Sequence, residues 1–222
     1  MNSPADTIEF LIGKFDLTIG AKHPTEIRNV NRTIMAQTLC ELGFTVGAEV
    51  GVAQGRHAEL LCRENPGLKL YAVDIWEPYA GYDEYTDRIG KYYEEAQARL
   101  APYNCQLVKK FSKEAARDFE DCSLDFVYID AAHDFENVAI DMCEWARKVR
   151  PGGIVFGHDY KRWSNRAKYI IQVKDVVQAF VYSYNIRPLF VLTNAIRDPM
   201  FGQDAPGWLF VRQESDRIPL QR

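Results

Sequence analysis

Two kinds of apolar pattern alternate along this chain and predict its secondary structure. Short, continuous apolar runs rich in β-branched and aromatic residues are typical of buried strands. They occur at 45–52, 68–76, 105–111, 124–130 and 154–160. Between them, apolar residues recur at the three- and four-residue spacing of one helix face. These segments are 29–42, 55–65, 85–100, 112–119, 137–149 and 173–184, the fifth being closed by an expected turn at "RPGG".

The alternation of strands and helices predicts an α/β fold. We expect a doubly wound, mostly parallel sheet with helices on both of its faces. Two late strands, 187–193 and 207–212, have no helix between them, so one of them is expected to pair antiparallel with its neighbour. Residues 1–43 precede the first of these strands and are predicted to form an appended N-terminal helical segment. Residues 44–222 would form the α/β domain.

The amino-acid composition indicates which kinds of binding partner the protein is expected to lack. The 222 residues carry a net charge of -4, whereas a dedicated nucleic-acid binder needs a basic surface. The five cysteines include no C-x-x-C pair, which indicates a reduced, intracellular protein without disulfides or a thiol-rich zinc site. We find neither a signal-peptide pattern nor an apolar run of membrane-spanning length. We therefore expect a cytoplasmic protein with no nucleic-acid or membrane partner.

The first candidate site is the loop that follows strand 45–52. Parallel sheets of this kind bind ligands beyond the carboxyl ends of their strands. Here the sequence reads "EVGVAQGR", in which Gly51 permits a tight turn and a close approach of ligand to backbone. It lacks the G-x-G-x-x-G pattern of dinucleotide loops, because Ala53 and Arg56 stand where glycines are expected. Glu49 would repel a pyrophosphate but suits a ligand with a cationic end; the alternative is a simple strand-to-helix turn.

Two further strand ends carry polar residues. Asp74 ends the second strand about 20 residues after the glycine loop, the spacing at which a carboxylate reaches ribose hydroxyls in this fold. Trp76 either covers an adenine face or fills the loop. After the third strand, Ser112 is a candidate both for adenine contact and for the N-cap of the next helix.

The fourth and fifth strands end in the richest cluster. Asp130 and His133 follow one strand, and His158 and Asp159 follow the next. Adjacent parallel strands bring these side chains to the same rim. Carboxylates there could bind a hard divalent ion or hydrogen-bond a substrate. The alternative is a helix cap at Asp134 beside a surface histidine.

Together these motifs resemble a known family. "AEVGVAQG", "YAVDIW" and "LDFVYIDAAHDFENVAIDMCEWARKVRPGGIVFGHDY" are similar to S-adenosylmethionine-dependent methyltransferases of Rossmann-like fold. The resemblance is closest to small-molecule O-methyltransferases related to those of macrolide sugars, and it covers roughly residues 45–212. It implies S-adenosylmethionine as the cofactor. The cofactor-binding residues would be Glu49, Gly51, Val52, Ala53, Gly55, Asp74, Ile75, Trp76, Phe111, Ser112 and Asp130.

The same resemblance implies roles in the chemistry. Asp130 would lie nearest the transferred methyl group, and His133 would accept the proton of the substrate. Asp130, Asp159 and His158 would be the ligands of a Mg²⁺ ion. In related sugar methyltransferases an acidic pair often stands at the last two positions, so His158 makes the ligand set softer than theirs.

The expected function is transfer of a methyl group to a hydroxyl of a small molecule, such as a sugar or a glycosylated metabolite. Two alternatives remain at this point: a nicotinamide-dependent oxidoreductase on a related fold, and a non-catalytic module that binds S-adenosylmethionine. Aromatic loop residues either contact the substrate or pack in the protein or in a homo-oligomer interface. They are Tyr79, Tyr82, Tyr85, Trp163 and Tyr169.

Overall fold

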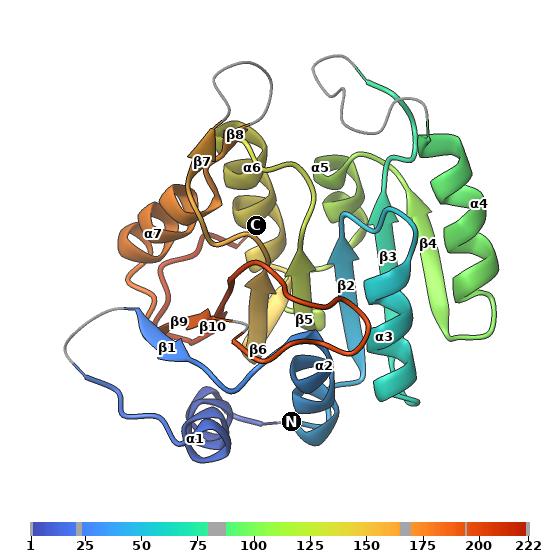
Figure 1. Ribbon diagram of the computed structural model, residues 1–222. Helices are drawn as coiled ribbons and strands as arrows, with labels where there is room; N and C mark the ends of the chain where they lie inside the picture. Colours follow the sequence, from blue (N-terminus) through green and yellow to red (C-terminus); the bar gives the residue numbers. More distant parts are fainter. Residues whose placement is uncertain (1, 21–23, 80–87, 165–169, 194, 221–222) are drawn as a thin grey trace.

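The computed structural model describes residues 2–20, 24–79, 88–164, 170–193 and 195–220 (Figure 1). Its helices are α1 (Pro4–Phe15), α2 (Arg32–Glu41), α3 (Arg56–Glu64), α4 (Ile89–Leu100), α5 (Ser112–Ala115), the 3₁₀ turn η1 (Ala116–Asp118), α6 (Phe135–Ala146) and α7 (Val173–Ser183). Its strands are β1 (Thr25–Ile27), β2 (Val46–Val50), β3 (Lys69–Asp74), β4 (Cys105–Lys109), β5 (Leu124–Ile129), β6 (Val149–Gly157), β7 (Trp163–Ser164), β8 (Ile170–Ile171), β9 (Leu189–Leu192) and β10 (Gly207–Val211).

A single eight-stranded sheet forms the centre of the molecule, in the order β1-β9-β10-β6-β5-β2-β3-β4. Strands β2 to β6 pair parallel with one another. β10 is antiparallel to both of its neighbours, β6 and β9. The predicted α/β sheet with one antiparallel late strand is therefore confirmed. The short strands β7 and β8 form a separate antiparallel ribbon.

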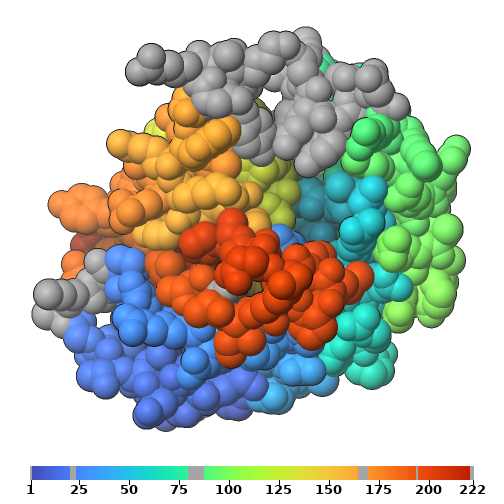
Figure 2. Space-filling view, in the orientation of Figure 1, coloured from blue at the N-terminus to red at the C-terminus, as the bar shows by residue number. Residues whose placement is uncertain are grey.

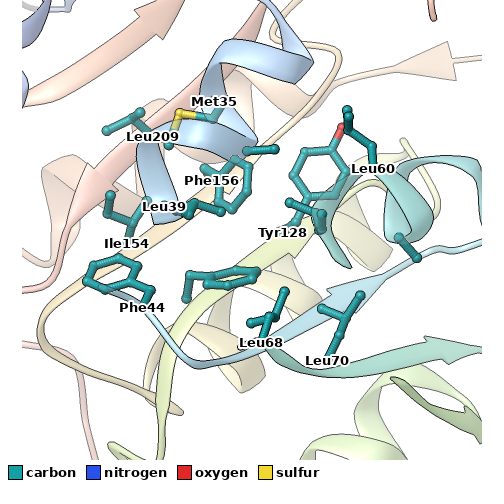
Figure 3. Packing of buried hydrophobic residues seen from close by; sticks show 14 of the residues in the cluster. Met35, Leu39, Phe44, Leu60, Leu68, Leu70, Tyr128, Ile154, Phe156 and Leu209 are labelled. Atoms are coloured by element: carbon teal, nitrogen blue, oxygen red, sulfur yellow. The ribbon is translucent and has the colours of Figure 1, made fainter. Parts of the chain in front are cut away.

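Helices cover both faces of the sheet, and each face has its own apolar core. α1, α2, α3 and α4 contribute to one core, where Met35 and Leu39 of α2 pack over Ile154 and Phe156 of β6 (Figure 3). α5, α6 and α7 contribute to the other core, which includes the fully buried Trp145. No helix in the described part of the chain is long and apolar enough to cross a membrane.

β1 belongs to the sheet, and α1 and α2 contribute to its core, which corrects the expectation that the sheet begins only after residue 43. β1 pairs parallel with β9 at the edge of the sheet, so the strand at 46–50 is the second strand in the chain and not the first. α1 packs against β6, where the buried Thr7 hydroxyl donates a hydrogen bond to the carbonyl of Gly152 at 2.8 Å. A three-residue strand is too short to show periodicity, which is why the sequence pattern did not reveal it.

Two local expectations were also wrong. "RPGG" does not form a turn before the fifth predicted strand: it lies inside β6, which runs from Val149 to Gly157 beside a shift of register in β5. The helix expected over 112–119 divides into α5 and the 3₁₀ turn η1. By contrast, Asp134 is the N-cap of α6 and accepts a hydrogen bond from the amide of Asn137, as the sequence suggested.

We predict that Thr7→Val lowers the free energy of unfolding by about 1–3 kcal/mol, because the buried carbonyl of Gly152 loses its donor while the side-chain volume hardly changes. Thr18→Val, on the exposed link after α1, is the control and should change stability by less than about 0.5 kcal/mol. Denaturant unfolding of both variants measures this. Equal stabilities would show that this hydrogen bond does not stabilise the packing of α1 on β6.

Candidate active site

A cavity of about 680 Å³ opens at the carboxyl ends of the central parallel strands. Its wall takes one or more residues from the loop after each of them. Gly51 follows β2, Asp74 ends β3, Lys110 follows β4, Asp130 follows β5 and His158 follows β6. This is the edge of the sheet where parallel α/β folds place their ligands.

The glycine loop after β2 is tightly wound and packs against the end of β5. Gly51 has a φ of +92° and Ala53 a φ of +47°, and Gly55 is the N-cap of α3. A Cβ atom on Gly51 would lie 2.3 Å from the carbonyl oxygen of Asp130. The tight turn expected at Gly51 is therefore confirmed. The close neighbour that requires glycine, however, is protein backbone.

Asp74 holds this loop in place. Its Oδ2 accepts hydrogen bonds from the amides of Val52 and Ala53, both at 2.9 Å, and its Oδ1 accepts one from the amide of Trp76 at 3.0 Å. The Trp76 side chain is buried and donates from Nε1 to the carbonyl of Ala53 at 2.8 Å. Val52, Ala53, Ile75 and Asp74 line the cavity, whereas Trp76 supports the loop from outside the cavity wall.

Glu49 lines the cavity from the end of β2 and is paired with a histidine that sequence reasoning missed. Its Oε2 lies 3.3 Å from Nδ1 of His57 in α3, and both side chains are buried. Burial raises the pKa of Glu49 well above its usual range and lowers the pKa of His57 well below its usual range. His57 is therefore uncharged at neutral pH, and burial disfavours the charged form of Glu49. His57 is one turn from the glycine loop, but nothing in its sequence context distinguished it from a surface histidine.

The predicted cluster after β5 and β6 is brought together. His133 Nε2 lies 3.1 Å from Asp159 Oδ2 and 3.6 Å from Asp130 Oδ1. His158 Nδ1 lies 3.2 Å from the same Asp159 oxygen and 3.8 Å from Asp130 Oδ1. Two carboxylates thus share two imidazoles.

Arg32 and Asp204 complete the cluster from distant parts of the chain. The Arg32 guanidinium, on the first turn of α2, donates to the carboxylate of Asp204 and has Nη1 3.6 Å from Asp130 Oδ2. Asp204 Oδ1 lies 2.8 Å from Nε2 of His158. Asp204 belongs to the segment between β9 and β10, which lies across the face of the molecule seen in Figure 2. Because Arg32 and Asp204 are 172 residues apart in the sequence, no sequence spacing could have indicated that they pair.

The carboxylates determine the charge of both imidazoles. Burial alone would lower the pKa of His133, but the carboxylates of Asp130 and Asp159 raise it to about 10. Burial opposes the same change at His158, whose pKa is raised to about 9 by Asp130, Asp159 and Asp204. Burial would raise the pKa of Asp159, but the two imidazoles hold it well below its usual range. In the free protein both histidines are therefore cationic at neutral pH.

The cluster does not fit a magnesium ion. Asp130, His133 and Asp159 each offer a donor atom, and these atoms lie within 4.8 Å of one another. Mg²⁺, however, prefers oxygen ligands, and one of these three donors is an imidazole nitrogen. Each carboxylate is also paired with a fixed cation, since Lys161 Nζ lies 2.7 Å from Asp159 and Arg32 lies beside Asp130.

The opposite end of the cavity is aromatic and carries one buried carboxyl group. Phe111 and Tyr79 meet edge to face, with ring centroids 5.4 Å apart. Ser112 is the first residue of α5 and not its N-cap, which is Phe111. Its hydroxyl accepts a hydrogen bond from Trp145 Nε1 at 2.8 Å and donates one to Asp141 of α6. Burial raises the pKa of Asp141 to about 7, against the opposing effect of the Ser112 hydroxyl.

Of the aromatic loop residues considered for substrate contact, Tyr79 lines the cavity, whereas Trp163 is about half exposed in β7. Tyr82, Tyr85 and Tyr169 lie outside the described residues.

Comparison with known proteins gives a family and a fold. A family model described as a methyltransferase domain matches residues 48–160, just over half of the 222 residues. The uncharacterized protein y4gI of Sinorhizobium fredii is 34% identical over 120 residues. The match covers 51% of this chain but only 12% of that relative, so the chain spans a small part of the relative's length.

Two solved structures illustrate the fold. An O-methyltransferase from Bacillus cereus in complex with SAH has a TM-score of 0.59 at 15% identity, over 94% of this chain and 90% of that one. The N-methyltransferase NodS from Bradyrhizobium japonicum, in complex with S-adenosyl-L-homocysteine, has a TM-score of 0.56 at 13% identity, over 82% and 86%. Similarity at these identities establishes the Rossmann-like fold and leaves the acceptor atom undetermined.

We predict that Gly51→Ala is more destabilising than the matched change Gly43→Ala. Both glycines have positive φ, so both variants lose about 1–2 kcal/mol to backbone strain. Only at Gly51 does the new Cβ also meet backbone, whereas at Gly43 no atom lies within 4 Å of it. We expect Gly51→Ala to cost about 1–3 kcal/mol more in denaturant unfolding, as other overpacked sites do. Equal losses in the two variants would contradict the packing of the loop on β5.

Proposed function

The chain belongs to the family of methyltransferase domains, and on this premise we propose that it transfers the methyl group of S-adenosylmethionine to a hydroxyl of a small molecule. The observation that carries the proposal is the single cavity wall that joins Asp74 and the glycine loop to the charge cluster of Asp130, His133 and Asp159. The first part would bind the ribose and methionine of the cofactor. The second would face the transferred methyl group.

The charge of the proposed cofactor suits this wall. S-adenosylmethionine carries a sulfonium and an ammonium group, and the loop it would lie on begins at Glu49 and ends against Asp130. Asp130 is held ionised: burial would raise its pKa, but His158, His133 and Arg32 together lower it below its usual range. In the proposed complex this carboxylate, whose charge Arg32 and the two imidazoles already balance in the free protein, would face the sulfonium. The glycine loop also lacks the second and third glycines of a dinucleotide fingerprint, which argues against the nicotinamide alternative.

The proposed reaction is an in-line displacement. The hydroxyl oxygen of the acceptor attacks the methyl carbon, the bond from carbon to sulfur breaks, and the sulfur keeps the electron pair, which gives S-adenosylhomocysteine. The hydroxyl proton would pass to the imidazole of His133. Because Asp130 and Asp159 keep this imidazole protonated in the free protein at neutral pH, the reactive form is the deprotonated minority. Alignment of donor and acceptor would supply much of the remaining acceleration.

Several finer points remain predictions. A sugar or glycosylated metabolite as acceptor, a cytoplasmic location, and the absence of nucleic-acid partners rest on the sequence alone. A homo-oligomeric state is a proposal on the same basis. Screening a panel of hydroxylated metabolites with radiolabelled S-adenosylmethionine identifies the acceptor, and turnover of any of them excludes the non-catalytic binding module.

We predict that the protein binds S-adenosylhomocysteine, and that Asp74→Ala weakens this binding by at least tenfold. The variant removes a ribose partner as well as the acceptor of three loop amides, and hydrogen bonds to a charged group are worth about 1.5–3 kcal/mol each. Calorimetric titration with S-adenosylhomocysteine and with NAD measures it. Asp118→Ala, an exposed acidic residue paired with Lys110, is the control and should bind as the wild type does. Tight binding of NAD in place of S-adenosylhomocysteine would overturn the choice of cofactor.

We predict that His133→Ala lowers kcat by about 10²–10⁴ while cofactor affinity is kept, as loss of a general base does. Wild-type kcat/KM should rise with pH above 7, because the pKa of His133 is raised to about 10 and only the neutral imidazole accepts the proton. Asp159→Asn removes one of the carboxylates that raise this pKa, so the rising limb should move to lower pH.

The same assays with EDTA test whether the cluster of Asp130, His133 and Asp159 works with a metal ion or without one. Activity should persist in EDTA, since the fixed cations beside Asp130 and Asp159 take the place of a metal. Loss of activity in EDTA that added Mg²⁺ restores would show that the enzyme needs a metal ion. A pH profile of His133→Ala that rises as the wild-type profile does would contradict the role of His133 as the general base.

A further inference from the structure

Arg32 is a charged residue of the cavity wall that the proposed reaction does not use. It stands on the first turn of α2, and only 14% of its side chain is exposed. A buried guanidinium is unfavourable unless it is paired, and this one faces two carboxylates. It donates to Asp204 through Nε and Nη2, and its Nη1 lies 3.6 Å from Oδ2 of Asp130. Arg32 therefore joins two acidic residues that lie far apart in the sequence, as a divalent cation would.

The guanidinium is held in this position by the segment between β9 and β10. The ring of Phe201 lies over it, with 4.8 Å between Cζ and the ring centroid. The buried Asp198 accepts hydrogen bonds from the amide and the hydroxyl of Thr33, both at 2.9 Å. These bonds fasten the segment to the helical turn that carries Arg32. The cation is thus fixed at its edge by Asp204 and on its face by Phe201.

Both oxygens of Asp130 are engaged in the free protein. Oδ2 accepts a hydrogen bond from the hydroxyl of Tyr128 at 3.2 Å and faces Arg32. Oδ1 faces the imidazoles of His133 and His158. An imidazolium can lose its proton and become a metal ligand, whereas a guanidinium keeps its charge in proteins and has no lone pair to offer. A divalent ion at Oδ2 would therefore meet a positive charge that cannot be removed.

The charge of Arg32 acts on the carboxylates and on a metal ion in opposite ways. For Asp130 and Asp204 it supplies the compensation that a bound metal ion would give. A metal ion itself would be repelled. Even with the screening of bulk water, a unit charge about 4 Å away weakens the binding of a divalent ion by more than about tenfold.

We propose that Arg32 is a built-in cation that replaces a divalent metal at this rim, neutralising Asp130 and Asp204 and excluding metal ions from the space between them. It is a positioning residue, because it acts through Asp130, whose carboxylate it holds beside the proposed site of methyl transfer. This catalytic part of the inference rests on the proposed function. The exclusion of metal ions is a property of the free protein and is tested without cofactor or acceptor.

The test titrates the free protein with Mn²⁺, which takes the carboxylate ligands that suit Mg²⁺ and loses its EPR signal on binding. Arg32→Met removes the charge and keeps an unbranched side chain. It should bind one Mn²⁺ per chain at least about tenfold more tightly than the wild type does. Arg32→Lys keeps a positive charge at this position and should exclude Mn²⁺ as the wild type does.

Arg28→Met is the matched control. Arg28 is 78% exposed, is paired with Glu26 and lies outside the cavity wall, so the same loss of charge there should leave the Mn²⁺ affinity unchanged. Adding Asp204→Asn to Arg32→Met should abolish the gained site, since an amide then replaces one of its two carboxylates. Thermal unfolding checks the fold of each variant. If Arg32→Met does not fold, Arg32→Gln, which keeps a donor for Asp204, takes its place.

Tighter Mn²⁺ binding by Arg32→Met, with Arg32→Lys and Arg28→Met unchanged, supports the proposal. Equal affinities of the wild type and Arg32→Met, absence of binding in both included, overturn it, as does Arg32→Lys binding Mn²⁺ as tightly as Arg32→Met. Once an acceptor is known, Mn²⁺ should partly restore the kcat that Arg32→Met loses, and no restoration would overturn the positioning role. Failure of the wild type to bind S-adenosylhomocysteine contradicts the proposed function and leaves the exclusion of metal ions standing.

Discussion

The carboxylate at the end of β5 constrains the architecture around it. Asp130 leaves a buried parallel strand beside the glycine loop, where an unpaired ion is strongly unfavourable. Its charge is compensated by Arg32 from the N-terminal part of the chain and by the imidazoles of His133 and His158. Arg32 in turn binds Asp204 from the C-terminal part. Pairing one buried charge therefore joins both ends of the chain to the centre of the sheet.

The cavity that results has two ends of different electrostatic character. At one end, charged side chains of both signs surround His133. A charged group of a ligand that binds there would therefore have partners already held in position. At the other end, aromatic and aliphatic side chains surround the carboxyl group of Asp141, to which the Ser112 hydroxyl donates a hydrogen bond. The glycine loop lies between the two ends and is held by Asp74. A ligand with a charged group at one end and a flat ring at the other would be complementary to both.

The histidines show how environment decides chemistry. An isolated histidine titrates near pH 6.5 and is mostly neutral in the cell. Here Asp130 and Asp159 raise the pKa of His133 to about 10. The imidazole that the sequence predicts to be a base is therefore protonated in the free protein at neutral pH. Buried in α3, His57 has the opposite shift, because burial dominates and the nearby charge of Arg32 lowers the pKa further. The same side chain is thus cationic in one wall of the cavity and neutral in another.

The sequence by itself determined the alternating α/β order, the antiparallel late strand, and the strand ends that carry Glu49, Asp74, Asp130 and Asp159, because periodicity and turn residues are local properties. It could not place β1, which pairs with β9 from more than 160 residues away. Nor could it identify Arg32, Asp204 or Asp141, since each looks like a solvated charge until a distant segment packs against it. Only the tertiary structure decided which charges are paired, and therefore which protonation states the site holds.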